Sequence, residues 1–139
     1  MPILDTEFIM GLGSADRKHR DVLKTLEKIK EGEIENVVVT DTAIWEVYTV
    51  LRNRGRVDEI GHIFRRLNEV CEEYEIKEMN LFSKELILRH ISMEKDHDLN
   101  FFDSLLAASA ENHDHSIISS DKIYEKLGLK RIPLGGEKV

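Results

Sequence analysis

The sequence has one cysteine, two prolines and no long apolar run, and each shortage narrows the possibilities. A single cysteine, Cys71, cannot form an internal disulfide, and its position on an apolar helical stripe predicts a small core residue. No apolar segment approaches the roughly 18 residues that a membrane-spanning helix needs. The first residues, MPILDT, have no basic region ahead of an apolar stretch, which argues against a secretory signal. We therefore expect a cytoplasmic protein without a membrane span.

Basic residues are fewer than acidic ones: the sequence has 20 Lys and Arg and 27 Asp and Glu, which gives a formal net charge of −7. This balance argues against a protein that holds nucleic acid mainly through a broad basic surface. It does not exclude an enzyme that binds nucleic acid locally, because cationic side chains and a bound divalent metal can reverse the sign of the potential in a site. The sequence also lacks a glycine-rich phosphate loop and a Ser-His-Asp pattern.

The 139 residues, 41% hydrophobic and 34% charged, fit one globular domain that spans residues 1–139. Short apolar runs alternate with segments of helical periodicity. The runs predict strands at 2–6, 37–40, 75–79, 116–119 and 130–134, and the periodic segments predict helices at 7–12, 16–31, 43–54, 57–74, 82–92, 101–110 and 122–127. Residues 94–98 are polar and predict a loop. This alternation predicts a three-layer α/β/α fold with a mostly parallel central sheet.

Local sequence also assigns positions within this fold. Residues 37–40 are β-branched throughout, which favours a central strand buried on both faces. The charges of 75–79 and Pro133 in 130–134 predict strands at the edges of the sheet. Asp41 or Thr42 can cap the helix that follows residue 40. Helical spacing places an apolar face on helix 43–54, made of Ile44, Val47, Tyr48 and Leu51. Helix 82–92 carries the apolar residues Leu86, Ile87 and Ile91.

Four acidic residues fall at one end of the predicted sheet. Asp5 ends the first strand, Glu46 lies in the first turns after the second, Asp103 opens the helix before strand 116–119, and Asp121 follows that strand. Ligand sites of open parallel sheets form outside the carboxyl ends of the strands. Like charges in a sheltered cleft are costly unless a cation neutralises them, and oxygen-only ligands suit Mg²⁺ or Mn²⁺. The pattern therefore predicts a divalent-metal site.

Each acid also has a purely structural explanation. Asp5 and Asp121 can cap the helices that follow them, and Asp103 can form a capping-box-like pair with Asn100, three residues earlier. Glu46 lies beyond the cap of its helix and beside the apolar face, where it can be a half-sheltered rim residue. The metal-site hypothesis depends on all four acids lying together.

Four segments, in this order, resemble a PIN domain. They are Leu4-Asp5-Thr6 at the end of the first strand, a glutamate early in the helix after the second strand, the helix DSLLAASA and the segment ISSDKIY. The resemblance covers nearly the whole chain. It implies a metal-dependent endoribonuclease, often the toxin of a toxin–antitoxin pair, whose acids would be Asp5, Glu46, Asp103 and Asp121. RNA would be the substrate, and an antitoxin and a second copy of the chain would be the expected protein partners.

Two positions differ from the pattern of that family. Glu7 stands where the family often has Asn, and Ser119 stands where it favours Thr. Serine keeps the hydroxyl group, whereas Glu7 adds an anion beside the proposed site and bears on metal affinity and substrate approach. Thr6, Glu7 and Ser119 are therefore candidates to support the acids or to contact the substrate.

The chemistry expected of such a site is phosphodiester hydrolysis. One or two bound Mg²⁺ or Mn²⁺ ions would lower the pKa of a bound water and stabilise charge on the attacked phosphate and on the leaving oxygen. Asp5 and Asp121 are expected to be the first metal ligands. Asp103 and Glu46 would complete the set as ligands or by orienting the attacking water, and the sequence does not separate these roles.

Three other groups of residues have two explanations each. His97, His113 and His115 could ligate a transition metal or belong to polar loops. Arg52, Arg54 and Arg56 could contact phosphates, or complement a helix dipole and cover apolar surface. Trp45 and Tyr48 could stack on bases, although their helical positions favour packing in the core or between subunits.

Two functions outside the enzyme class remain open at this stage. A catalytically weak PIN-like module could act through antitoxin binding or homodimerisation, which the acidic surface and Glu7 would favour. A phosphotransfer receiver domain also gathers acids at strand ends. The sequence places neither its lysine nor its phosphoaccepting aspartate convincingly.

Overall fold

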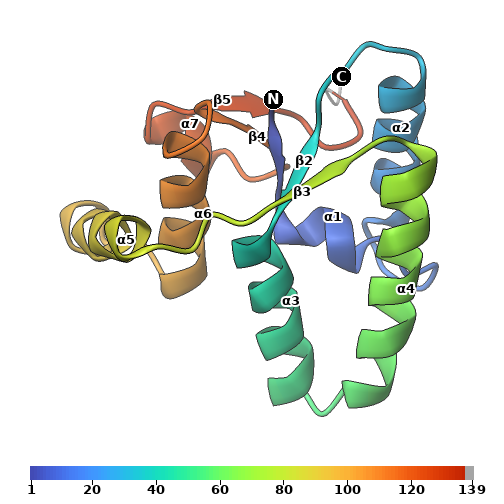
Figure 1. Ribbon diagram of the computed structural model, residues 1–139, viewed down its shortest axis with the longest axis horizontal. Helices are drawn as coiled ribbons and strands as arrows, with labels where there is room; N and C mark the ends of the chain where they lie inside the picture. The colour runs from blue at the N-terminus through green and yellow to red at the C-terminus, as the bar shows by residue number, and fades with distance from the viewer. Residues whose placement is uncertain (137–139) are drawn as a thin grey trace.

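The computed structural model describes residues 1–136 and contains a sheet of five parallel strands in the order β3-β2-β1-β4-β5 (Figure 1). The strands are β1 (Ile3–Leu4), β2 (Val38–Thr40), β3 (Lys77–Met79), β4 (Ser116–Ile118) and β5 (Lys130–Ile132). The first strand is therefore the middle one, and its two neighbours come from distant parts of the chain. Ile3 is in register with Val38 on one side and with Ile117 on the other.

Helices cover both faces of this sheet. They are α1 (Thr6–Met10), α2 (His19–Lys30), α3 (Asp41–Asn53), α4 (Val57–Glu73), α5 (Lys84–His97), α6 (Phe101–Glu111) and α7 (Ile123–Lys126). In Figure 1, α5 and α6 lie on one side of the strands and α2 and α4 on the other. The predicted three-layer α/β/α fold with a parallel sheet is confirmed. No helix within residues 1–136 has the length and apolar character needed to cross a membrane.

The strand positions follow the sequence closely. β2 lies inside the sheet and is buried along its whole length, as its β-branched residues predicted. β3 and β5 form the two edges, which is also as predicted. The last strand is shorter than 130–134 and ends before Pro133, which has no backbone N–H to donate to a sheet.

Two details around α3 and α5 differ from the prediction. The N-cap of α3 is Thr40, whose hydroxyl accepts a hydrogen bond from the Ala43 N–H at 3.2 Å, rather than Asp41 or Thr42. The polar residues 94–98 do not form a loop, because α5 continues to His97 and ends at Asp98 in a left-handed conformation. Polar residues continue this helix because α5 packs on α6 and leaves its other face to solvent.

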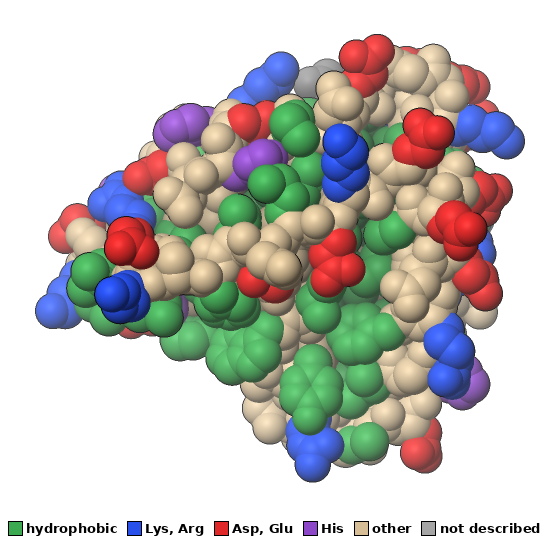
Figure 2. All heavy atoms as spheres, viewed as in Figure 1, with side chains coloured by type: hydrophobic (Ala, Val, Ile, Leu, Met, Phe, Trp, Pro, Cys, Tyr) green, Lys and Arg blue, Asp and Glu red, His purple; other side chains and the backbone are tan. Residues whose placement is uncertain are grey.

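Several apolar residues of the two helices α3 and α5 are exposed. Ile87 and Ile91 on α5 are 47% and 42% exposed, and Tyr48 on α3 is 41% exposed. Only one face of α5 is buried, and it carries Leu86 together with His90 and Met93. Figure 2 shows hydrophobic side chains gathered on the surface over and beside α3. Cys71, predicted to be a core residue, is partly buried against the core.

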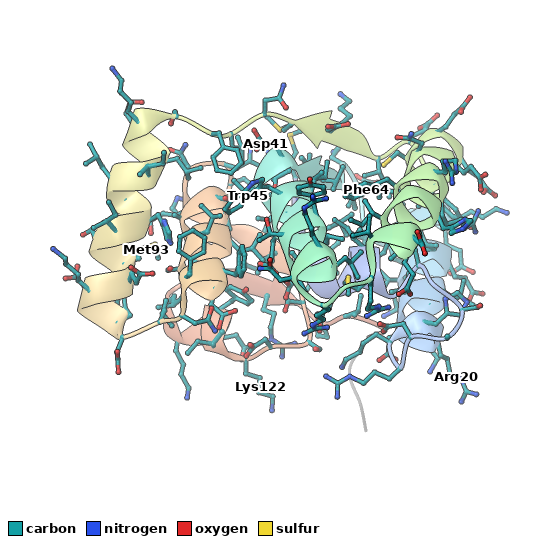
Figure 3. All side chains as sticks on the ribbon, turned by 90° about the horizontal axis from the view of Figure 1, so that it is seen from below. Arg20, Asp41, Trp45, Phe64, Met93 and Lys122 are labelled. Atoms are coloured by element: carbon teal, nitrogen blue, oxygen red, sulfur yellow. The ribbon has the colours of Figure 1, made fainter. Side chains whose placement is uncertain are left out.

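Asp41 has a structural role at the beginning of α3 (Figure 3). Its carboxylate accepts hydrogen bonds from the Leu81 N–H at 2.8 Å and the Phe82 N–H at 3.2 Å. These bonds tie the segment between β3 and α5 to the carboxyl end of β2. Asp41 is thus engaged in holding the edge of the fold together.

Candidate active site

Asp5 lies directly after the central strand and is 7% exposed. As the N-cap of α1, it accepts a hydrogen bond from the Thr6 N–H at 2.6 Å. Its other carboxylate oxygen accepts a hydrogen bond from the Ser119 hydroxyl at 2.5 Å. Burial raises the pKa of Asp5 to about 6, and the charge of Glu7 adds to this rise, while hydrogen bonds from the Ser119 hydroxyl and from the backbone and side chain of Thr6 oppose it. Asp5 therefore caps α1 and is at the same time one of the candidate site acids.

Glu46 projects from α3, which packs against α1 and α6. It is partly buried, as predicted for a residue at the rim of the apolar face. Burial raises its pKa to about 7, and the charges of Asp5 and Asp103 raise it further, against a hydrogen bond from Thr6. Glu46 therefore lies close enough to both aspartates to be affected by their ionisation.

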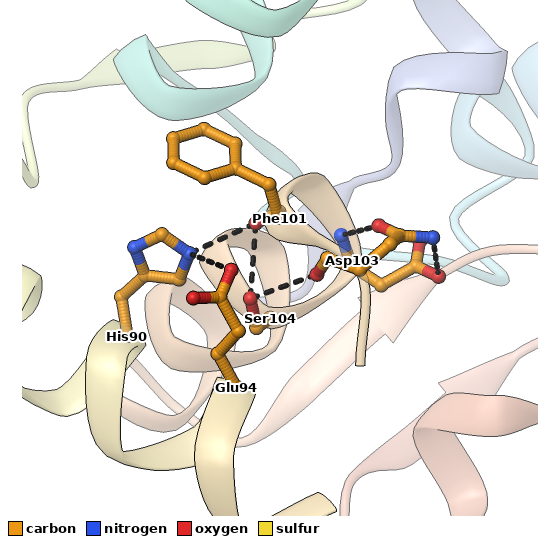
Figure 4. A network of polar contacts seen from close by, with 6 residues as sticks. His90, Glu94, Phe101, Asp103 and Ser104 are labelled. Carbon is orange, nitrogen blue, oxygen red and sulfur yellow. Dashed lines mark hydrogen bonds and ion pairs between the residues drawn. The ribbon is translucent and has the colours of Figure 1, made fainter. Parts of the chain in front are cut away.

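Asp103 is held in the first turn of α6 by Asn100 (Figure 4). The Asn100 side-chain amide donates to the Asp103 carboxylate at 2.7 Å, and the Asp103 N–H donates to the Asn100 side-chain oxygen at 2.8 Å. This reciprocal pair is the capping arrangement that the spacing of the two residues predicted. The pKa of Asp103 is nevertheless raised, first by burial and then by the charge of Asp121. The capping role does not remove Asp103 from the group of acids.

The start of α6 is itself fixed by α5. Nε2 of His90, a residue that is 5% exposed, donates to the Phe101 carbonyl at 2.9 Å (Figure 4). The Ser104 hydroxyl bonds to the carbonyls of Asn100 and Phe101. These contacts fix the turn that presents Asp103, so α5 contributes to the site without adding a functional side chain.

Asp121 is exposed and follows β4 after two serines. Its carboxylate accepts a hydrogen bond from the Ile123 N–H at 3.0 Å, and its own N–H donates to the Ser119 hydroxyl at 3.0 Å. Ser119, which is fully buried, thus links the Asp5 carboxylate to the backbone of Asp121. A hydroxyl at this position serves both contacts.

The buried Tyr124 on α7 is affected by the charges of all four acids. It is 1% exposed, and its pKa is raised first by burial and then by the charges of Asp5, Asp103, Glu46 and Asp121. All four acids therefore lie near enough to Tyr124 for their charges to influence it. Tyr124 was not among the predicted site residues, although it ends the segment ISSDKIY that carries part of the family resemblance.

Glu7 does not stand free beside the acids. Its carboxylate accepts hydrogen bonds from the Ser120 N–H at 2.5 Å and the Ser120 hydroxyl at 2.7 Å, and a longer one from the Ser119 hydroxyl at 3.5 Å. Glu7 therefore clamps the first helix to the loop after β4. These hydrogen bonds stabilise the Glu7 carboxylate in its position near Asp5. The charge of Glu7 nevertheless raises the Asp5 pKa.

A cleft of about 290 Å³ opens between α1, α3 and the segment that joins α1 to α2. Thr6, Glu7 and Glu46 line it, together with Lys18 and Arg54. Of the three arginines singled out in the sequence, only Arg54 lines this cleft.

The side chains near Arg54 have other contacts. Arg52 lies 5.9 Å from the Tyr48 ring and Arg56 pairs with Glu59.

Trp45 is 42% exposed rather than part of the core, and its ring lies about 6 Å from those of Phe82, Phe101 and Phe102.

The four acids fit a hard divalent cation by their chemistry. Within residues 1–136, no three His, Cys, Asp or Glu side chains form a ready-made metal-binding group, and this holds for the three histidines as well. Mg²⁺ needs no such group, because it keeps several water ligands and contacts proteins through one or two carboxylates. The donors are all oxygens, and the raised pKa values of Asp5, Glu46 and Asp103 reflect in part a repulsion that a cation would relieve.

Comparison with known families gives one clear match. The family model described as PIN domain matches residues 3–130. No curated protein sequence matches the chain significantly.

Three solved structures share the fold at low sequence identity. VapC20 of Mycobacterium tuberculosis, described as a sarcin-ricin loop cleaving toxin, is 16% identical with a TM-score of 0.67 and covers 93% of this chain and 96% of its own. A toxin–antitoxin complex from Klebsiella pneumoniae is 15% identical with a TM-score of 0.53 and covers 88% of each chain. FitAB bound to the IR36 DNA fragment is 13% identical with a TM-score of 0.66 and covers 100% of this chain and 99% of its own.

Proposed function

Because the chain belongs to the PIN domain family, we propose that it is an Mg²⁺- or Mn²⁺-dependent endoribonuclease that hydrolyses RNA phosphodiester bonds. The observation that supports this proposal is that the charges of Asp5, Glu46, Asp103 and Asp121 all raise the pKa of the buried Tyr124. Sheltered acids that raise one another's pKa are a costly arrangement for stability alone, and a cation-dependent activity explains why the fold keeps it. We also propose that residues 1–139 form a single domain.

Within this site the acids have different environments, which supports different roles. Asp5 and Asp121 are linked through Ser119 and are the proposed first ligands of the metal. When bound, the metal would supply a more acidic water and charge stabilisation for phosphodiester hydrolysis. Asp103, held by Asn100, completes the acidic set. Glu46, with a pKa raised to about 7, is suited to hold or accept a proton from the attacking water.

A ribonuclease assay with matched substitutions tests this proposal. We expect cleavage of structured or single-stranded RNA with Mg²⁺ or Mn²⁺, none in EDTA, and at least an approximately hundredfold loss with Asp5→Asn or Asp121→Asn. Asp58→Asn, an exposed aspartate in the first turn of α4, is the control and should retain activity. Activity that survives both site substitutions, or that needs no metal, would contradict the proposal.

The relatives in solved structures support a place in a toxin–antitoxin pair. One of them is described as a toxin and another as a toxin–antitoxin complex. We propose on this basis that the chain is a cytoplasmic toxin held in check by an antitoxin protein. Co-expression with the neighbouring reading frame, followed by purification of the pair, would test this, and growth arrest without that frame is the expected result.

A second candidate function is protein association by a catalytically weak PIN-like module, either with an antitoxin or as a homodimer. The observation that favours it is a group of exposed aromatic side chains, in which the Trp45 ring lies about 6 Å from those of Phe82 and Phe101. Contiguous exposed apolar surface commonly marks an interaction site. Calorimetric titration with Mn²⁺ separates the two functions, because an enzyme of the proposed kind should bind the ion and a module without a metal site should not.

A further inference from the structure

A second cleft, of about 420 Å³, lies on the other side of the Glu7–Ser120 contact. Lys18, Ser120, Lys122 and Arg131 line it, next to Pro133. All charged side chains that line it within residues 1–136 are cationic. In a chain with a net charge of −7, this is a local reversal of sign, and it occurs beside the acids rather than far from them.

The lysines of this cleft are not engaged in ion pairs within residues 1–136. Lys122 is exposed at the surface (Figure 3), and neither Lys122 nor Lys18 has a carboxylate within 4.0 Å among residues 1–136. The Arg131 side chain is only 11% exposed and donates to the Ser119 carbonyl at 3.0 Å, with Glu125 at 3.4 Å. Its buried Nε has no hydrogen-bond partner in the same part of the chain. A guanidinium held in place by the Ser119 carbonyl and Glu125, beside two ammonium groups that have no carboxylate partner in that part of the chain, is a chemistry that suits phosphate.

The cleft is joined to the acid cluster through short, direct contacts. Ser120 lines it, while Ser119 and Asp121 on either side of Ser120 belong to the acid site. Lys18 donates to the Ser120 hydroxyl at 3.3 Å, and the same hydroxyl donates to Glu7. Lys18 also lines the first cleft, the one that contains Glu46 and Arg54, and no other described residue lines both.

We propose that the cleft of Lys18, Ser120, Lys122 and Arg131 holds the phosphodiester backbone of the RNA on one side of the acid cluster, with Lys18 at the passage to the first cleft. This inference rests on the proposed function and extends it to how the substrate is placed. An RNA strand bound to Lys122 and Arg131 in this cleft and to Arg54 in the first cleft would pass the acids between them. One of its phosphates would then be held next to the acids despite their negative charge. The cleft would contact phosphates, which position a nucleic acid without reading its sequence.

Salt dependence of RNA binding tests this inference separately from cleavage. Binding of a fluorescein-labelled single-stranded RNA of mixed sequence is measured by fluorescence anisotropy, in Mg²⁺ and over a range of KCl concentrations. The Asp5→Asn chain is used so that the RNA stays intact, and Asn remains a good N-cap for α1. Lys122→Gln should weaken binding and reduce the slope of log K against log salt by about 0.7, the value for one phosphate contact with a single strand.

Matched substitutions on neighbouring exposed lysines serve as controls. Lys126→Gln lies on α7, and Lys24→Gln on α2 is the counterpart of Lys18→Gln. Each control makes the same change in net charge and should leave the slope unchanged, and thermal melting monitored by circular dichroism checks that every variant is folded. Equal slopes for Lys122→Gln and Lys126→Gln, or no RNA binding at all, would overturn the inference.

Cleavage by the unsubstituted chain separates this failure from failure of the proposed function. If that chain cleaves RNA while the slopes are equal, the cleft is wrong and the nuclease stands. If it cleaves no RNA while Lys122→Gln and Lys18→Gln lower the slope, the cleft stands as an RNA-binding site and the proposed hydrolysis is wrong.

Discussion

Replacing Asp5 by Asn should make the metal-free protein more stable at alkaline pH. The Asp5 pKa of about 6, against an ordinary value of 3.8, means that the folded state binds this proton more tightly than the unfolded state does. The free energy of unfolding therefore falls as the pH rises from about 4 to about 6 and stays lower above that range. At about 1.36 kcal/mol per pH unit, the ionised Asp5 costs up to about 3 kcal/mol at pH 8.

The substitution keeps the local contacts that could confuse the result. Asn can still accept the hydrogen bond from the Thr6 N–H, and its amide can donate to the Ser119 hydroxyl in place of the bond that Asp5 now accepts. Loss of the Asp5 charge also removes one of the influences that raise the Glu46 pKa, which acts in the same direction. The expected gain is therefore near zero at about pH 4 and approaches about 3 kcal/mol at pH 8.

Urea unfolding in EDTA, followed by circular dichroism and by the fluorescence of the single tryptophan, Trp45, measures this difference. Asp121→Asn is the control, because Asp121 is exposed and its neutralisation should change stability by no more than about 0.5 kcal/mol. Addition of Mg²⁺ at pH 8 should stabilise the unsubstituted chain and not the Asp5→Asn chain. A stability difference that is the same at pH 4 and pH 8 would refute the assignment of a burial penalty to Asp5.

Two further predictions concern Glu7 and Cys71. Glu7→Gln should lower the Asp5 pKa, because the charge of Glu7 helps to raise it, and carboxyl carbon titration by NMR of the metal-free protein would show this; an unchanged or higher pKa would contradict the contact. Cys71 has a pKa raised to about 11 from 9.0, mainly by burial, so its alkylation by iodoacetamide at pH 8 should be roughly a hundredfold slower than that of an unfolded chain, as mass spectrometry can follow. Equal rates for folded and urea-unfolded protein would show that Cys71 is not sheltered.

The sequence predicted those parts of the fold that depend on local pattern. The β-branched run 37–40 could be assigned to the middle of the sheet because a strand buried on both faces needs no alternation. The end of α5 could not, since residues 94–98 are polar whether they form a loop or the solvent face of an outer helix. Thr40 was overlooked as a cap because it also completes β2, and Asp41 instead binds the distant backbone of Leu81.

The sequence pattern suggested the acids of the candidate site but not their connections. Strand ends and helix starts place Asp5, Glu46, Asp103 and Asp121 at one end of a parallel sheet from pattern alone. The contacts of Glu7 with Ser120 and the position of Tyr124 depend on how β4 and α7 pack against β1, which no local pattern records. The cationic cleft was missed for the same reason, because Lys18 and Arg131 are far apart in the sequence and meet only in the folded chain.

The hydrogen bond from Ser119 to Asp5 joins residues that are 114 positions apart in the chain. Because β1 pairs with β2 and β4, the central strand is the first to be synthesised, and it is not paired on both sides until β4 has been made. Closing such a long loop is slow and has to precede the contacts that reward it. During translation, the acids would therefore remain apart until β4 has left the ribosome. A growing chain would therefore carry no assembled form of the proposed cleavage site close to the RNA of the ribosome that makes it.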